Sequence, residues 1–205
     1  MQDADPFDAE TAKRVVDELD RARAAEYSLL STLLAGSPDA QLIGRIAGLG
    51  EDLSPLGRAH AALGKAAARA DADSVAREYF DLFIGVGRGE LLPYASYYQT
   101  GFLHSRPLAR VREALARIGV ARADGETEPE DHAAILFEVM AGLVGGNISA
   151  PAGTDREIFE THLAPWIGRF FADLERAQSG EFYARVGALG RVFVEIESEA
   201  FALPA

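Results

Sequence analysis

The sequence predicts an all-α protein, a bundle of about nine to ten helices. Apolar residues recur at the i, i+3, i+4 spacing of helices through most of the chain, whereas no convincing period-two alternation marks a strand. β-Branched residues are sparse outside these helical patterns. A chain of 205 residues is long enough to bury one continuous core, so we expect a single domain over residues 1–205.

Glycine, proline and small polar residues divide the N-terminal half into helices. The first ends at "AGSPDA", where Gly36 and Pro38 stop a helix and Ser37 or Asp39 can cap the next one. The expected helices are residues 9–34, residues 39–47, an Ala-rich helix from Ser54–Pro55 to about Ala70, and a helix capped by Asp73 or Ser74 with Val75, Tyr79, Leu82 and Phe83 on one face.

The stretch "GVGRGELLPYASYYQTG" (85–101) is rich in glycine and aromatic residues, and we expect it to be no regular helix. Its alternating glycines resemble a nucleotide-binding loop, but no strand precedes them and no Gly-Lys-Ser/Thr follows. We therefore expect Gly85 to end the preceding helix. Tyr94, Tyr97 and Tyr98 in this loop either form a binding surface or fill the core.

The C-terminal half also has a helical pattern. The expected helices are residues 104–120 with Leu108, Val111, Leu115 and Ile118 inward, residues 129–144, a segment over about 154–178 in which Pro165 starts a new helix after His162, and residues 180–201. The polar break at 119–128 could serve as a hinge between two helical parts. Trp166 is expected to pack inward.

The segment "ETEPEDH" crowds four carboxylates around Pro129, immediately before an apolar run. Thr127 and Glu130 have the spacing of a capping box, and Pro129 is tolerated in a first helical turn. Capping would account for these three residues. It does not account for the adjacent Asp131 and His132, so a functional site remains an alternative.

The spacing of the candidate ligands does not support a metal site. The four histidines never stand three or four residues apart, and Glu-x-x-His does not occur. We therefore expect no metal and no cofactor. A metal- or nucleotide-dependent hydrolase that uses Asp131, His132 and His162 is the alternative function.

Composition sets the broad class of the protein. The formal net charge of −12 argues against binding to a nucleic-acid backbone. The absence of cysteine excludes disulfides and cysteine nucleophiles. The acidic N-terminus has no apolar core of the kind found in secretory signals, and no apolar run approaches the ~20 residues that cross a bilayer. We expect a cytoplasmic protein without a membrane span.

Four ordered motifs carry a resemblance to a known family. They are "EYFDLFIG" (78–85), "LPYASYY" (92–98), "EPEDH" (128–132) and "HLAPW" (162–166). As a set, over roughly residues 70–175, they resemble the TorD/DmsD family of redox-enzyme maturation chaperones, which are relatives of the NarJ-type chaperones. Each motif alone is weak, and their order and spacing give the set its specificity.

The resemblance implies an all-α protein that is no enzyme. Such chaperones bind the twin-arginine leader, and sometimes the body, of a molybdopterin oxidoreductase subunit while its cofactor is inserted, and they delay its export. Domain-swapped dimers occur in the family, so a homodimer is an expected partner. Clients of the formate dehydrogenase, dimethyl sulfoxide reductase and trimethylamine N-oxide reductase types are all allowed.

Leader recognition needs carboxylates for two arginines and an apolar groove for the segment that follows. Glu128, Glu130 and Asp131 can supply the carboxylates, and His132 can orient Asp131. The full set of residues expected to bind the peptide is Tyr79, Leu82, Phe83, Pro93, Tyr94, Ser96, Glu128, Pro129, Asp131, His132, His162 and Trp166.

Overall fold

The computed structural model describes residues 16–50, 52–122, 125 and 127–203. In these ranges the chain forms ten α-helices and two short π-helical turns, without a strand, which confirms the all-α prediction. They are α1 (Glu18–Ala35), α2 (Ala40–Ala47), α3 (Pro55–Ala67), α4 (Ala72–Tyr79), η1 (Phe80–Ile84), α5 (Ala95–Thr100), α6 (Arg106–Arg117), α7 (Ala133–Val144), α8 (Thr154–Ile158), η2 (Phe159–Leu163), α9 (Ile167–Arg176) and α10 (Glu181–Ala202).

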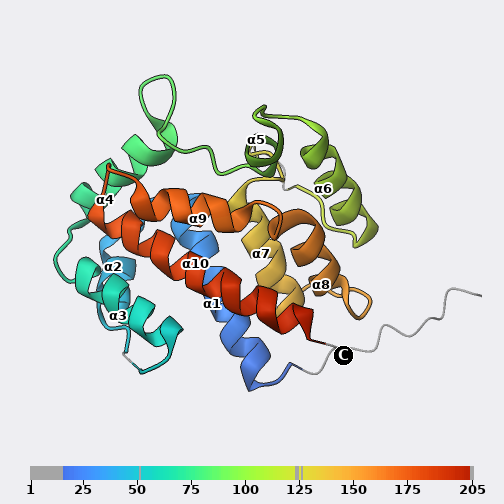
Figure 1. Ribbon diagram of the computed structural model, residues 1–205, viewed down its shortest axis with the longest axis horizontal. Helices are drawn as coiled ribbons and strands as arrows, with labels where there is room; N and C mark the ends of the chain where they lie inside the picture. Colours follow the sequence, from blue (N-terminus) through green and yellow to red (C-terminus); the bar gives the residue numbers. More distant parts are fainter. Residues whose placement is uncertain (1–15, 51, 123–124, 126, 204–205) are drawn as a thin grey trace, which may run out of the picture.

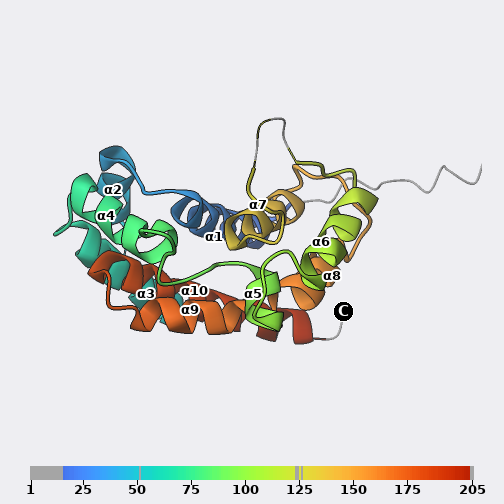
Figure 2. The ribbon, with the colours of Figure 1, turned by 90° about the horizontal axis from the view of Figure 1, so that it is seen from above.

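Two helix pairs form the centre of the molecule. Helix α1 packs along α7, and α9 packs along α10. Figure 2 shows the α1–α7 pair as one layer and the α9–α10 pair as the other, and Figure 1 shows α2, α3 and α4 at one end with α5, α6 and α8 at the opposite end. The core between the layers is largely aromatic and aliphatic; its largest fully buried side chains include Trp166, Tyr27, Tyr183, Phe137, Phe159, Phe170, Phe171 and Phe182.

The α9–α10 pair depends on a close approach of the two backbones. A Cβ atom added at Gly187 of α10 would lie 2.4 Å from the backbone nitrogen of Glu175. Real side chains do not fit at that distance, so this crossing requires glycine.

Several helix ends follow local sequence as predicted. The Asp39 side chain accepts the backbone N–H of Leu42 at the start of α2, and Ser54 accepts that of Gly57 at the start of α3. Gly85 ends η1 with φ 62°, a left-handed conformation that favours glycine. The helix-ending interpretation of this glycine is therefore confirmed.

Three local predictions are wrong. Val16 and Asp17 were expected to be helical, but within the described chain the first helix begins at Glu18, with Asp17 as its N-cap; residues 9–15 lie outside the described chain. Helix α4 is capped by Asp71, whose side chain accepts the Ser74 N–H while the Ser74 hydroxyl accepts the Asp71 N–H. Residues 95–100 form helix α5 inside the stretch expected to be irregular.

The segment 154–178 divides where Pro165 was expected to start a new helix. Helix α8 and η2 run to Leu163, and α9 begins at Ile167. The expected hinge at 119–128 includes residues 123–124 and 126, which lie outside the described chain.

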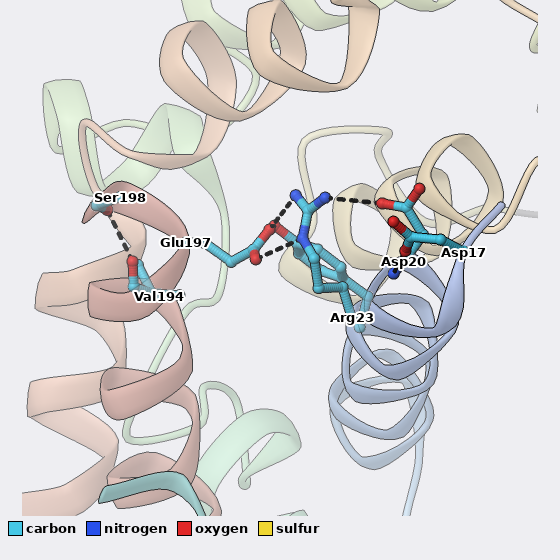
Figure 3. A network of polar contacts seen from close by, with 7 residues as sticks. Asp17, Asp20, Arg23, Val194, Glu197 and Ser198 are labelled. Atoms are coloured by element: carbon cyan, nitrogen blue, oxygen red, sulfur yellow. Dashed lines mark hydrogen bonds and ion pairs between the residues drawn. The ribbon is translucent and has the colours of Figure 1, made fainter. Parts of the chain in front are cut away.

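A buried ion pair joins the two layers (Figure 3). Arg23 of α1 donates from Nε and Nη2 to the two carboxylate oxygens of Glu197 in α10, each at 2.8 Å. The Tyr27 hydroxyl donates to the same carboxylate at 2.7 Å. Because the Glu197 side chain is only 1% exposed, these donors satisfy a charge that lies almost completely inside the protein.

Candidate functional site

A cavity of about 700 Å³ opens between α1, α6, α7 and the segment before α7. Its lining is mainly apolar and also contains carboxylates and arginines. The lining residues are Ser31, Ala35, Tyr79, Arg112, Leu115, Ala116, Val120, Ala121, Arg122, Glu128, Glu130, His132, Ala134, Ile135, Glu138, Val139 and Ile148.

The segment before α7 is extended and pairs with the residues before α5. Tyr94 and His132 form an antiparallel bridge, in which the Ala95 N–H donates to the Asp131 carbonyl at 3.0 Å and the Ala133 N–H donates to the Pro93 carbonyl at 2.8 Å. This pairing fixes the motifs "LPYASYY" and "EPEDH" side by side. Both motifs therefore contribute to one structural unit.

The predicted capping box at Thr127 and Glu130 is wrong. Helix α7 begins at Ala133 with His132 as its N-cap, because the bridge to Tyr94 holds His132 in an extended conformation with ψ 139°. The carboxylates of Glu128 and Glu130 consequently precede the helix and do not lie in its first turn.

His132 caps α7 through an imidazole nitrogen. Nδ1 accepts the backbone N–H of Ala134 at 3.1 Å, which requires Nδ1 to be unprotonated. The ring also makes an edge-to-face contact with Tyr94, with centroids 5.0 Å apart. Its position is therefore set by both its own helix and the preceding loop.

Tyr94 links the bridge to the carboxylates of the cavity. Its hydroxyl donates to Glu128 Oε1 at 2.5 Å. Burial raises the pKa of Tyr94, and the hydrogen bond to Glu128 raises it further. Tyr94 therefore stays protonated and holds the Glu128 carboxylate beside the cavity.

Asp131 is fully buried, and its carboxylate caps α5. Oδ2 accepts the backbone N–H of Ser96 at 2.7 Å, in the first turn of that helix. Oδ1 has no hydrogen-bond partner among the described residues. This contact explains why "YASYYQT" forms a helix although no side chain within α5 caps it.

A second, smaller cavity of about 130 Å³ lies on the other side of the bridge. The predicted site residues are thus divided between two cavities: Tyr79, Glu128 and His132 line the large one, and Tyr94, Ser96, Pro129 and Asp131 line the small one together with Leu103 and His104. Pro93 is buried, and its carbonyl takes part in the bridge.

The remaining predicted site residues lie in or near the core. Leu82 is fully buried, and Phe83 packs against Tyr79 and Tyr183 with centroid separations of 5.1 and 5.5 Å. Trp166 is 1% exposed, as expected, and its indole N–H donates to the His162 carbonyl at 2.7 Å. The large cavity is lined by none of the four remaining residues, which are Leu82, Phe83, His162 and Trp166.

The π-helical turn η1 lies within the motif "EYFDLFIG", and η2 overlaps the first two residues of the motif "HLAPW". Turn η1 contains "FDLFI", and η2 contains "FETHL". Such turns are frequent at functional sites. His162 in η2 is 6% exposed, and burial lowers the pKa of its imidazole, which favours the neutral ring.

Sequence reasoning missed the cationic wall of the large cavity and one of its carboxylates. Arg112 and Arg122 both line it, and Arg112 Nε donates to Glu130 Oε2 of the acidic segment at 2.7 Å. Glu138, also in the lining, is the one carboxylate of α7. Glu138 is the single charged residue in the apolar run "AAILFEVMAGLV", and this isolated charge could have indicated a functional residue.

The described residues contain no group of three or more His, Cys, Asp or Glu side chains arranged to hold a metal ion. In the same ranges no helix is sufficiently long and apolar for a membrane crossing.

The sequence model of the nitrate reductase delta subunit family matches residues 50–172, more than half of the chain. The chain belongs to this family. It is the family of the TorD and NarJ proteins, which are chaperones and not enzymes. The resemblance carried by the four motifs is confirmed.

Individual relatives agree with this assignment. The chain is 28% identical over 144 residues to the chaperone protein TorD of Vibrio cholerae serotype O1, an alignment that covers 65% of this chain and 66% of that protein, just under two thirds of its length. It is 29% identical over 126 residues to the chaperone protein TorD of Ferrimonas balearica, covering 60% of this chain and 57% of that protein.

One solved structure has a similar fold. The fold is similar to a crystal structure described as that of a redox enzyme maturation protein from Archaeoglobus fulgidus, with a TM-score of 0.60 over 89% of this chain and 97% of that one. At 20% sequence identity this similarity shows the shared fold alone.

Proposed function

We propose that this protein is a cytoplasmic chaperone for a molybdoenzyme subunit and that it binds the twin-arginine leader of that subunit in the large cavity. The observation that carries the proposal is the combination of a mainly apolar lining and three carboxylates in one cavity of about 700 Å³. The carboxylates are Glu128, Glu130 and Glu138. Two of them belong to the motif "EPEDH".

The chemistry of a leader matches these two features. Its two guanidinium groups require carboxylates, and charge-assisted hydrogen bonds between such groups are stronger than neutral ones. The apolar segment that follows forms a helix that can lie in a groove lined by aliphatic side chains. Leu115, Val139 and Ile148 provide such side chains beside the carboxylates.

Asp131 and His132 have positioning roles in this proposal. Asp131 is fully buried and holds α5, whereas His132 fixes the start of α7 and contacts Tyr94. Together they keep Glu128 and Glu130 on a rigid segment beside the cavity. A ligand then binds without first ordering that segment.

Affinity purification from the native organism, grown anaerobically with molybdate, tests the client. We expect mass spectrometry to identify one molybdoenzyme precursor that retains its leader. Recovery of no oxidoreductase would contradict the proposed function.

Titration of the corresponding leader peptide tests the site. Glu128→Gln/Glu130→Gln should weaken binding at least ten-fold, the effect of losing one or two charge-assisted hydrogen bonds. Glu181→Gln/Glu195→Gln is the matched control, since both carboxylates are exposed on α10, pair with Arg69 and Arg191, and do not line the cavity. Equal weakening in both proteins would argue for attraction by overall charge and against this site.

A further inference from the structure

One carboxylate of the large cavity is already engaged by an arginine of the protein itself. Arg112 of α6 donates from Nε to Glu130 Oε2 at 2.7 Å, and both residues line the cavity. The Glu130 side chain is 14% exposed, whereas that of Arg112 is 50% exposed. The arginine side chain is therefore the more accessible member of this pair.

Glu130 remains a charged acceptor in this arrangement. Burial acts to raise its pKa, but backbone hydrogen bonding and the charges of Arg112 and Arg122 outweigh burial and lower the pKa below its ordinary value. A negatively charged Glu130 binds any guanidinium that reaches it.

We propose that Arg112 competes with the leader for Glu130: it occupies the carboxylate in the free chaperone, and an arginine of the leader displaces it on binding. This inference rests on the proposed function and adds a regulatory contact to the same site. Arg112 and a leader arginine present the same chemical group to the same acceptor.

The contact is of a kind that can be displaced. The bond to Glu130 is the one hydrogen bond that the Arg112 side chain makes within the described ranges, and half of that side chain is exposed. Arg23 shows the opposite case, since it donates to both oxygens of a buried carboxylate. Exposed single contacts contribute little to stability, so Arg112 can exchange its partner without disturbing the fold.

Removal of Arg112 should therefore strengthen leader binding. We expect Arg112→Gln to lower the Kd of an Arg-Arg leader peptide about two- to five-fold, the equilibrium equivalent of one exposed ion pair. The same peptide with both arginines replaced by glutamine should show no gain. Fluorescence anisotropy of labelled peptides measures these constants.

Arg117→Gln is the matched control. Arg117 lies on the same helix and pairs with Glu157 at 2.7 Å, but it does not line the cavity. Both substitutions remove one positive charge, so a general attraction for cationic peptides affects them equally. Arg112→Met, which keeps an apolar stem of similar length, is a second variant.

The Glu130→Gln background completes the test. If Arg112 competes for Glu130, its removal has no further effect once Glu130 has lost its charge. Binding to Arg112→Gln and Arg112→Met that is no tighter than to Arg117→Gln would overturn this inference and leave the proposed function in place. Absence of binding by every protein, the parent included, would overturn both.

Discussion

The carboxylate of Asp131 caps a helix that belongs to another part of the chain. It accepts the N–H of Ser96, 35 residues earlier, while its own segment turns into α7. Glu78 has a similar role, since its carboxylate accepts the N–H of Tyr183 at 3.1 Å in the first turn of α10, 105 residues away. At the scale of single residues, these two carboxylates of the sequence motifs thus cap helices that lie far from them in the chain.

Substitutions at Asp131 separate a positioning role from direct binding of an arginine. Asp131→Ala removes the cap of α5 and should lower the free energy of unfolding by about 0.5–2 kcal/mol, whereas Asp131→Asn retains a capping oxygen and should stay near the parent. Urea denaturation measures both. If Asp131 only positions other groups, the Asn variant also binds leader peptide as the parent does.

The opposite result has a definite meaning. An Asn variant that unfolds like the parent but loses peptide binding would show that the charge of Asp131 contacts the leader. The positioning role proposed above would then be wrong.

At the scale of elements, α1 and α3 are joined by an imidazole–carboxylate pair. His60 Nε2 lies 2.9 Å from Glu26 Oε2, and the Glu26 side chain is largely buried. The hydrogen bond to Glu26 raises the pKa of His60 and outweighs the burial that acts to lower it. The contact between these helices is therefore strongest when His60 is protonated.

This pair predicts a pH dependence of stability with a definite sign. Because the folded pKa of His60 lies above the unfolded value of about 6.5, its contribution is complete below pH ~6.5 and disappears as pH rises through the folded pKa. The free energy of unfolding of the parent minus that of His60→Gln should decline over this window in urea titrations. A constant or rising difference would contradict the assignment.

The difference in free energy between the two proteins is compared, and not the parent alone, because His162 also titrates. Burial lowers the pKa of its imidazole, so the His162 contribution is lost as pH falls, which is the opposite sign. Because both proteins contain His162, its contribution cancels in the difference.

At the scale of the whole molecule, the contact between Arg23, Tyr27 and Glu197 connects the α1–α7 layer with the α9–α10 layer (Figure 3). The apolar core includes side chains from all four of these helices. Apolar packing is tolerant of small shifts, whereas a bidentate arginine–carboxylate pair has one favourable geometry. We infer that this pair sets the register between the layers.

Breaking the pair should destabilise the molecule strongly. Arg23→Met leaves the Glu197 charge buried with the Tyr27 hydroxyl as its one remaining donor among the described residues, and should lower the free energy of unfolding by about 3–5 kcal/mol. The double variant Arg23→Met/Glu197→Gln removes the buried charge and should recover most of that loss. Guanidinium denaturation measures both; a single variant that costs less than ~1 kcal/mol would show that Glu197 reaches water.

The sequence by itself determined the fold class and most helix boundaries. Asp39, Ser54 and Gly85 act on backbone groups within a few residues, so their positions could be predicted from local chemistry. The four motifs, taken together, also indicate the family. Local caps and ordered motifs depend on residues that are neighbours in the sequence or follow one another in a set order, so the sequence alone contains them.

The tertiary structure alone decided how the site is built. Because Tyr94 and His132 form a bridge, α7 begins at Ala133 and not at residue 129. The carboxylate of Asp131 caps α5, which is helical where the local sequence indicated a loop. Arg112 reaches Glu130 only because α6 packs beside the segment before α7. Each of these contacts joins residues that are distant in the chain, so its energy depends on how the helices pack, which local sequence patterns do not encode.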